Sequence, residues 1–150
     1  MIKRIIGPEH KTKSEDNEHW PTLDTIAQVE ATSEEMAHPI ESGLLPNSES
    51  GWEAAQPGPQ TVRLLFERPQ RIKHVHLEFQ EYQSARTQEF VLRWSSSGGR
   101  SYAEIVRQQY TFSPPDTTAE RDDYSVDLDG MTNLQLTIIP EVSGGPARAT

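Results

Sequence analysis

The fold of this chain is decided by residues 61–80, which read TVRLLFERPQRIKHVHLEFQ. Large apolar residues occupy every second position in each half of this stretch, and a period of two places them on one face of a β-strand. They are Val62, Leu64 and Phe66 in the first half, and Val75, Leu77 and Phe79 in the second. Arg68-Pro69-Gln70 lies between the halves and predicts a turn, because proline lacks the N–H that a strand interior needs. The stretch therefore predicts two strands, Thr61–Glu67 and Arg71–Gln80, each with one buried face.

Segments with the same alternation flank this stretch, and clusters of Pro, Gly, Ser and Asn separate them. The further predicted strands are Thr25–Thr32, Gln88–Ser95, Tyr102–Tyr110, Asp123–Leu128 and Leu134–Ile139. Short alternating strands between turn residues are typical of an all-β sandwich, in which two sheets face each other. The only predicted helical turn is Ser33–Ala37, which Pro39 is expected to end.

The chain has 150 residues, enough for one domain, and its formal net charge of -9 disfavours nucleic acid as a partner. Residues 7–21 are polar and charged without an apolar period, so we expect residues 1–21 to form a flexible N-terminal segment and residues 22–150 to form the domain. The sequence has no Cys, and no apolar run has the length of a signal peptide or a membrane span. We therefore expect a cytoplasmic protein that does not insert into membranes.

Several local motifs occur together in the order that one known family shows. They are the acidic-Gly loop Glu41-Ser42-Gly43-Leu44-Leu45, the aromatic that follows it in Gly51-Trp52-Glu53, the strands 60–66 and 72–77, and the strand, turn and aromatic of residues 89–102. From Leu23 onward the chain thereby resembles the discoidin family, also called coagulation factor 5/8 type C domains, whose fold is galactose-binding-like. Ser97 stands where the family's turn has an Asp.

The resemblance implies a jelly-roll β-sandwich of two antiparallel sheets that binds sugars, lipids or proteins through loops at one end. Some family members hold a structural Ca²⁺ beneath the acidic-Gly loop with carbonyls, carboxylates and a C-terminal Glu. Residues 144–150 of this sequence contain no Glu. We therefore expect no cofactor, with a structural Ca²⁺ as the one exception that the resemblance leaves open.

A sugar or an apolar partner needs exposed aromatic rings on which to stack, beside polar groups that fix its orientation. The candidate ligand-binding residues are Trp52, Glu41, Tyr82, Arg86, Tyr110 and Phe112. For Trp52 and Phe112 the alternative is that they plug the ends of the core. We interpret the chain first as a non-enzymatic carbohydrate-binding module, and the alternative is a protein–protein interaction domain of the same fold.

A third hypothesis is a metal-dependent enzyme. His74, His76 and Glu78 alternate along one predicted strand, so their side chains share a face, and enzymes use such His-x-His pairs to bind Zn²⁺. A metal site also needs a third convergent ligand and a fixed shell around it. The sequence contains no Walker loop, no dinucleotide fingerprint and no Gly-x-Ser-x-Gly elbow, so we predict no catalytic residue and no metal ligand.

Overall fold

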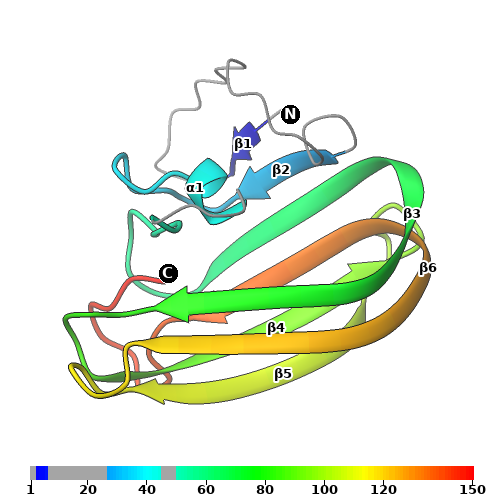
Figure 1. Cartoon of the computed structure of the whole chain (residues 1–150). Coiled ribbons are helices and arrows are strands. Elements are labelled where there is room, and N and C mark those ends of the chain that lie inside the picture. Colours follow the sequence, from blue (N-terminus) through cyan, green and yellow to red (C-terminus); the bar gives the residue numbers. More distant parts are fainter. Residues whose placement is uncertain (1–2, 7–26, 45–49) are drawn as a thin grey trace.

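The computed structural model describes residues 3–6, 27–44 and 50–150. Its elements are β1 (Lys3–Ile5), β2 (Ala27–Ala31), α1 (Ile40–Leu44), β3 (Gln60–Gln80), β4 (Arg86–Ser95), β5 (Ala103–Phe112) and β6 (Ala119–Ile139) (Figure 1). All described elements except the short α1 are strands, so the predicted all-β class is confirmed. No helix among the described residues has the length and the apolar composition of a membrane span.

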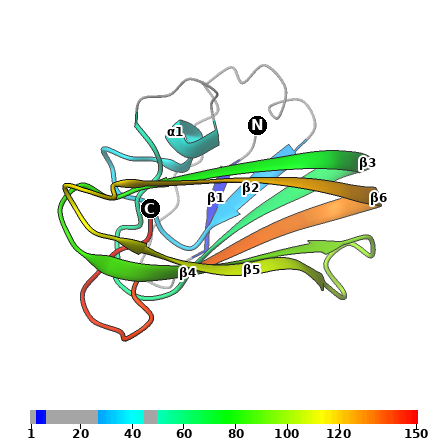
Figure 2. The same ribbon diagram turned by 60° about the horizontal axis from the view of Figure 1, so that its bottom comes forward.

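The strands form one six-stranded sheet in the order β1-β2-β3-β6-β4-β5. β1 pairs with β2 in parallel, and every other neighbouring pair is antiparallel. β3 and β6 pair from Gln60 opposite Ile138 to Gln80 opposite Ala119. The hydrogen bonds thus define one continuous sheet where we predicted two, because β3 and β6 bend together and continue where we predicted strand ends (Figures 1 and 2).

The predicted turn at Arg68-Pro69-Gln70 is a bend within β3. The pairing of β3 with β6 shifts register in this region, and such irregularities accommodate a residue that has no N–H to donate. The bend in β6 contains Gly130, whose φ of 70° is a conformation that favours glycine. The predicted strands Asp123–Leu128 and Leu134–Ile139 are accordingly the two halves of β6.

The bend brings the second half of β3 across β4 and β5, neither of which neighbours β3 in the sheet. The Phe79 ring stacks on that of Phe90 with centroids 5.2 Å apart, and its centroid lies 5.3 Å from that of Tyr110. Val62 and Phe79, which the alternation assigns to the interior, both belong to the buried core. The core therefore lies between the folded-back half of β3 and the strands that it crosses.

Part of the predicted N-terminal segment belongs to the sheet. Lys3–Ile5 forms β1, and Ile5 is 6% exposed within the core. The sequence pattern missed this strand because its 3 residues are too few to show a period. Residues 7–21 lie outside the described residues, as do positions 25 and 26 of the predicted strand Thr25–Thr32.

The predicted helical turn at Ser33–Ala37 is wrong. α1 begins at Ile40, directly after Pro39. Proline favours the start of a helix, because the first N–H groups of a helix have no partner within it. Ser33 is buried instead, and its hydroxyl donates to Gln60 Oε1 at 2.7 Å. Pro39 thus precedes a helix rather than ending one.

Candidate functional site

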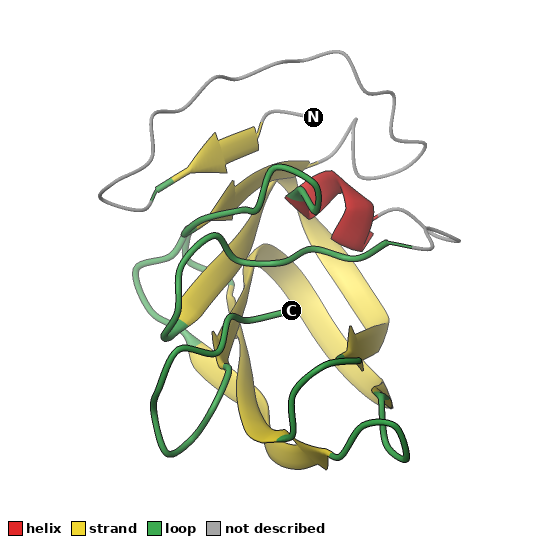
Figure 3. Cartoon of the chain, turned by 90° about the vertical axis from the view of Figure 1, so that its left-hand side faces the viewer, coloured by secondary structure: helices red, strands yellow, loops and turns green. Residues whose placement is uncertain are grey.

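Several loops gather at the end of the molecule that faces the viewer in Figure 3, and we call this surface the loop end. It consists of residues 32–39, 50–59, 81–85, 113–118 and 140–150. Backbone hydrogen bonds join these loops: Glu81 N donates to Thr118 O at 2.8 Å, and Ala54 N donates to Ala149 O at 2.8 Å. Glu35 N donates to Glu53 O at 2.7 Å, so loops 32–39, 50–59 and 140–150 form one group, and loops 81–85 and 113–118 form another.

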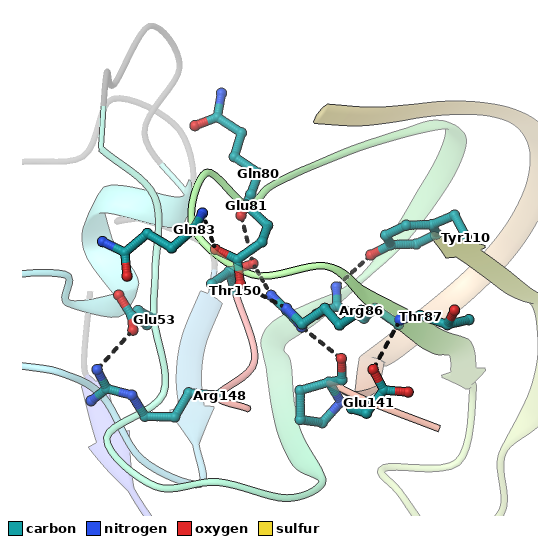
Figure 4. A network of polar contacts seen from close by, with 12 residues as sticks. Glu53, Gln80, Glu81, Gln83, Arg86, Thr87, Tyr110, Glu141, Arg148 and Thr150 are labelled. Carbon is teal, nitrogen blue, oxygen red and sulfur yellow. Dashed lines mark hydrogen bonds and ion pairs between the residues drawn. The ribbon is translucent and has the colours of Figure 1, made fainter. Parts of the chain in front are cut away.

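Arg86 holds the loop end together from beneath its surface. The residue is 4% exposed. Its Nε donates to Glu81 Oε1 at 2.8 Å, and Nη1 donates to Pro140 O at 2.7 Å. Its Nη2 donates to Thr150 Oγ1 at 3.2 Å, as Figure 4 shows. The assignment of Arg86 to ligand binding is therefore corrected: it joins the β3–β4 loop to the C-terminal segment, and its donors face the protein.

Trp52, Tyr110 and Phe112 belong to the packing of the core rather than to an exposed binding surface. Trp52 is 7% exposed and Phe112 is 0% exposed. Trp52 Nε1 donates to Ser33 O at 3.0 Å. The Tyr110 hydroxyl accepts a hydrogen bond from Gln88, and burial raises the pKa of Tyr110. The prediction that these rings bind ligand is wrong, and the alternative that Trp52 and Phe112 plug the core is confirmed.

Glu41 lies in the first turn of α1, where its carboxylate contacts Lys3 Nζ of β1. Its other oxygen, Oε2, is buried and has no hydrogen-bond partner among the described residues. The Glu41 side chain is 14% exposed. This residue therefore belongs to the packing between β1 and α1, which corrects its assignment as a ligand-binding residue.

Tyr82 is the predicted binding residue that remains accessible. It is 64% exposed and lies in the loop between β3 and β4. Glu81, which precedes it, accepts a hydrogen bond from buried Arg86 and another, at 3.3 Å, from Gln83 N. The ring therefore stands on a loop that is fixed on both sides of Tyr82.

Two further apolar side chains are exposed at the loop end, and the sequence did not predict them as binding residues. Met36 is 94% exposed and Val142 is 46% exposed. Arg148 connects the turn that carries Met36 to the C-terminal segment, since its Nη1 lies 3.6 Å from Glu35 Oε2. Each apolar residue lies in a short turn without a period, so no pattern distinguishes it from the solvated residues around it.

The loop end is acidic. Its carboxylates are Glu34, Glu35, Glu53, Glu81, Asp116 and Glu141. The nearby cations are engaged, since Arg86 donates to Glu81, and Arg148 Nη2 lies 3.1 Å from Glu53 Oε1 (Figure 4). The Ser143 and Thr87 backbone N–H groups lower the pKa of Glu141, so this carboxylate stays charged at neutral pH.

The histidines of the third hypothesis lie on the exposed face of β3. His74 Nε2 is 3.0 Å and His76 Nδ1 is 2.8 Å from Asp123 Oδ1. The contact with His76 lowers the pKa of Asp123 most, and the contact with His74 lowers it further. The His74 and His76 side chains are 58% and 49% exposed. Among residues 3–6, 27–44 and 50–150, no group of three His, Asp or Glu is placed to hold a metal ion. The structure thus gives the metal-dependent hypothesis no support.

A second polar cluster lies along β6, where Glu120, Asp122 and Tyr124 alternate and are partly buried. Burial raises the pKa of Glu120, and the charge of Asp122 raises it further. Asp122 Oδ2 and the Tyr124 hydroxyl are buried, and neither has a hydrogen-bond partner within the described part of the chain. Buried polar atoms without partners weaken a fold.

We expect Glu120→Gln to flatten the dependence of stability on pH. Because the pKa of Glu120 is raised on folding, this residue favours folding below the ordinary carboxyl range, about 4 to 4.5, and that contribution is lost as the pH rises through its folded pKa. Urea unfolding of both proteins between about pH 4 and about pH 7 measures the difference. The wild type should lose stability relative to the variant over this range, and parallel profiles would exclude a role for Glu120.

The chain matches no protein-family model and no curated protein. Solved structures do match it. The family 32 carbohydrate-binding module of C. perfringens NanJ, in complex with galactose, has a TM-score of 0.56 at 15% identity, over 82% of this chain and 88% of that one. The family 32 module of AlyQ, in complex with 4,5-unsaturated mannuronic acid, has a TM-score of 0.57 at 16% identity, over 81% and 88%.

A chain in the structure of reduced XRCC1 bound to the DNA polymerase β catalytic domain also matches, with a TM-score of 0.53 at 16% identity, over 79% of this chain and 87% of that one. At such low identities the likeness concerns the fold. It confirms the predicted discoidin, or galactose-binding-like, fold.

Proposed function

We propose that this protein is a non-enzymatic carbohydrate-binding module that binds sugar at the loop end, with the Tyr82 ring as its stacking surface. The observation that carries the proposal is the 64% exposure of Tyr82 on a loop that buried Arg86 fixes. The modules of the same fold that are in complex with galactose and with an unsaturated mannuronic acid support it. The finer description of the fold as a jelly-roll sandwich belongs to the same proposal.

Binding at this surface needs no covalent step. The face of the Tyr82 ring offers apolar area to the C–H face of a sugar, and exposed Gln83 and Ser84 offer an amide and a hydroxyl for its hydroxyl groups. Because Glu81 and Arg86 hold the loop before the ligand arrives, little conformational entropy is lost on binding.

Most carboxylates of the loop end already have hydrogen-bond or ion-pair partners, and this favours binding over catalysis. Acid–base hydrolysis of a glycosidic bond requires two carboxyl groups that both reach the bond. Arg86 engages Glu81, Arg148 engages Glu53, and the backbone N–H groups of residues 87 and 143 engage Glu141. We therefore infer binding without hydrolysis and without a cofactor.

The charge of the loop end favours a neutral sugar, or one that carries an amine, over a uronic acid. A uronate needs a free cation, but Arg86 is buried and Arg148 already lies between Glu35 and Glu53. The remaining carboxylates would repel a negatively charged ligand, more strongly at low salt.

Titration calorimetry with galactose, glucosamine and uronate oligosaccharides tests this proposal. We expect a neutral or amino sugar to bind and the uronates to bind weakest. Tyr82→Ala should weaken binding by about tenfold or more, which corresponds to about 1.4 kcal/mol, because the sugar loses its stacking partner.

Tyr102→Ala is the matched control. Tyr102 follows the opposite end of β4, a strand of 10 residues, and so lies about 30 Å from the Tyr82 loop. Binding should be unchanged in this variant. If no saccharide binds, or if both variants bind as the wild type does, the proposal fails.

A protein partner is the second candidate, and the exposure of Met36 and Val142 is the observation that favours it. Apolar side chains offer no hydrogen bond to the hydroxyl groups of a sugar. They are typical of the centre of a protein interface. Met36→Ala separates the two functions: it should leave sugar affinity unchanged in the calorimetry, and it should weaken the capture of a protein partner in a pull-down.

A further inference from the structure

The Lys3 ammonium lies between two carboxylates where β1 meets the segment that contains α1. Lys3 Nζ is 2.9 Å from Glu34 Oε1 and also contacts Glu41 Oε1. The three side chains are 18%, 13% and 14% exposed, so little water reaches the contact. Figure 1 shows β1 beside β2, on the side of the molecule that carries α1.

The ammonium allows Glu34 and Glu41 to share this place. Two carboxylates around one point repel each other when little water screens them, unless a cation lies between. Burial alone would lower the pKa of Lys3, but the contacts with Glu41 and Glu34 outweigh it and raise that pKa, so Lys3 stays charged. Glu34 Oε2 also accepts a hydrogen bond from Ile40 N, the first residue of α1, at 2.9 Å. The cation therefore positions the start of the helix as well.

The same residues do not fit the structural Ca²⁺ that the discoidin resemblance implies beneath the acidic-Gly loop. Ca²⁺ takes about six to eight oxygen ligands at about 2.3–2.6 Å. An ion that close to Glu34 Oε1 and Glu41 Oε1 would lie next to the Lys3 ammonium, which already contacts both oxygens. Two cations cannot share one pair of carboxylates at this separation without strong repulsion. Within the described part of the chain, Glu41 Oε2 is a further buried oxygen without a hydrogen-bond partner, and these three carboxylate oxygens do not make up a coordination shell.

We propose that Lys3 takes the part that a structural Ca²⁺ plays in some discoidin-family members, so that β1 supplies the cation and the fold needs no divalent metal. The acidic-Gly loop then depends on the docking of β1. This inference does not rest on the proposed function, because the contact is internal to the fold.

Thermal unfolding of the full chain tests the metal-free half of this proposal. Neither added Ca²⁺ nor EDTA should move the Tm of the wild type by more than about 1 °C, since a metal that does not bind the native state cannot stabilise it. A rise of several degrees with Ca²⁺, or a fall with EDTA, overturns the proposal.

Substitution of Lys3 tests the second part of the proposal, that its ammonium stabilises the fold. Lys3→Met should lower the Tm by about 5 °C or more, because it leaves two carboxylates facing each other with little water. Arg4→Met is the matched control from the same strand, since the Arg4 side chain is 63% exposed and its ion pair with Glu30 is 3.5 Å long. The control should stay within about 2 °C of the wild type. Equal melting of the two variants overturns the proposal.

A charge-retaining variant keeps the test decisive if Lys3→Met does not fold. Lys3→Arg should fold and melt above any Lys3→Met protein, because a guanidinium can also bridge the two carboxylates. Adding Glu34→Gln and Glu41→Gln to Lys3→Met should restore part of the lost stability. If Lys3→Arg is as unstable as Lys3→Met, and the triple variant is no better, the side chain acts by packing and the proposal is wrong.

Discussion

Arg86→Met is expected to lower the free energy of unfolding by about 3 to 5 kcal/mol, the usual cost of removing one partner from a buried ion pair. Arg86 is 4% exposed, and Glu81, its partner at 2.8 Å, has a side chain that is 18% exposed. Methionine fills a similar volume but donates nothing, so Glu81 Oε1 and the Pro140 carbonyl lose the donor that they share. Urea unfolding at neutral pH measures the change.

Arg107→Met is the control for that experiment. Its side chain is 46% exposed, and its ion pairs with Glu89 and Glu104 are 3.5 and 3.2 Å long, so the loss should stay below about 1 kcal/mol. The double variant Arg86→Met with Glu81→Gln should recover part of the loss, because no unpaired carboxylate remains. An Arg86→Met protein as stable as the control would show that the network beneath the loop end contributes nothing to the fold.

Phe90→Ala is expected to cost about 3 to 5 kcal/mol as well, for a different reason. Phe90 is 0% exposed, and its ring stacks on that of Phe79. Since the folded-back half of β3 does not neighbour β4 in the sheet, side-chain packing of this kind is what holds the two together. Truncation leaves a cavity on the inner side of that contact, and urea unfolding measures its cost.

Tyr82→Ala is the matched control for an aromatic ring. Because Tyr82 is 64% exposed, its loss should change the free energy of unfolding by less than about 0.5 kcal/mol. A Phe79→Ala, Phe90→Ala double-mutant cycle should add a coupling of about 0.5 to 1.5 kcal/mol. Additive losses in the cycle would mean that the two rings do not support each other.

The strands could be predicted because each carries an apolar face long enough to show its period. Val62 and Phe79 lie in the core, where the period of two placed them. The bend at Pro69 could not be predicted in the same way. Proline marks either a strand end or an irregularity within a strand, and only the pairing with β6 decides between them.

The candidate site was harder to predict than the strands, because exposure is a property of packing rather than of residue type. Trp52 and Tyr82 both lie in polar loops, yet one is 7% exposed and the other 64%. No sequence pattern marked Lys3 as a residue of structural importance. Its partners, Glu34 and Glu41, lie more than thirty positions along the chain, and only the parallel pairing of β1 with β2 brings them to it.

The pairing of β3 with β6 along their whole length also determines the order in which parts of the chain can fold. Arg63 donates to Gln135, a residue 72 positions further on, so that edge of β3 finds its partner only after most of the chain exists. Closing so long a loop is slow, and refolding should take milliseconds to seconds rather than microseconds. On the ribosome, β3 stays without its longest neighbour until β6 has emerged, and its apolar face is open to aggregation throughout that interval.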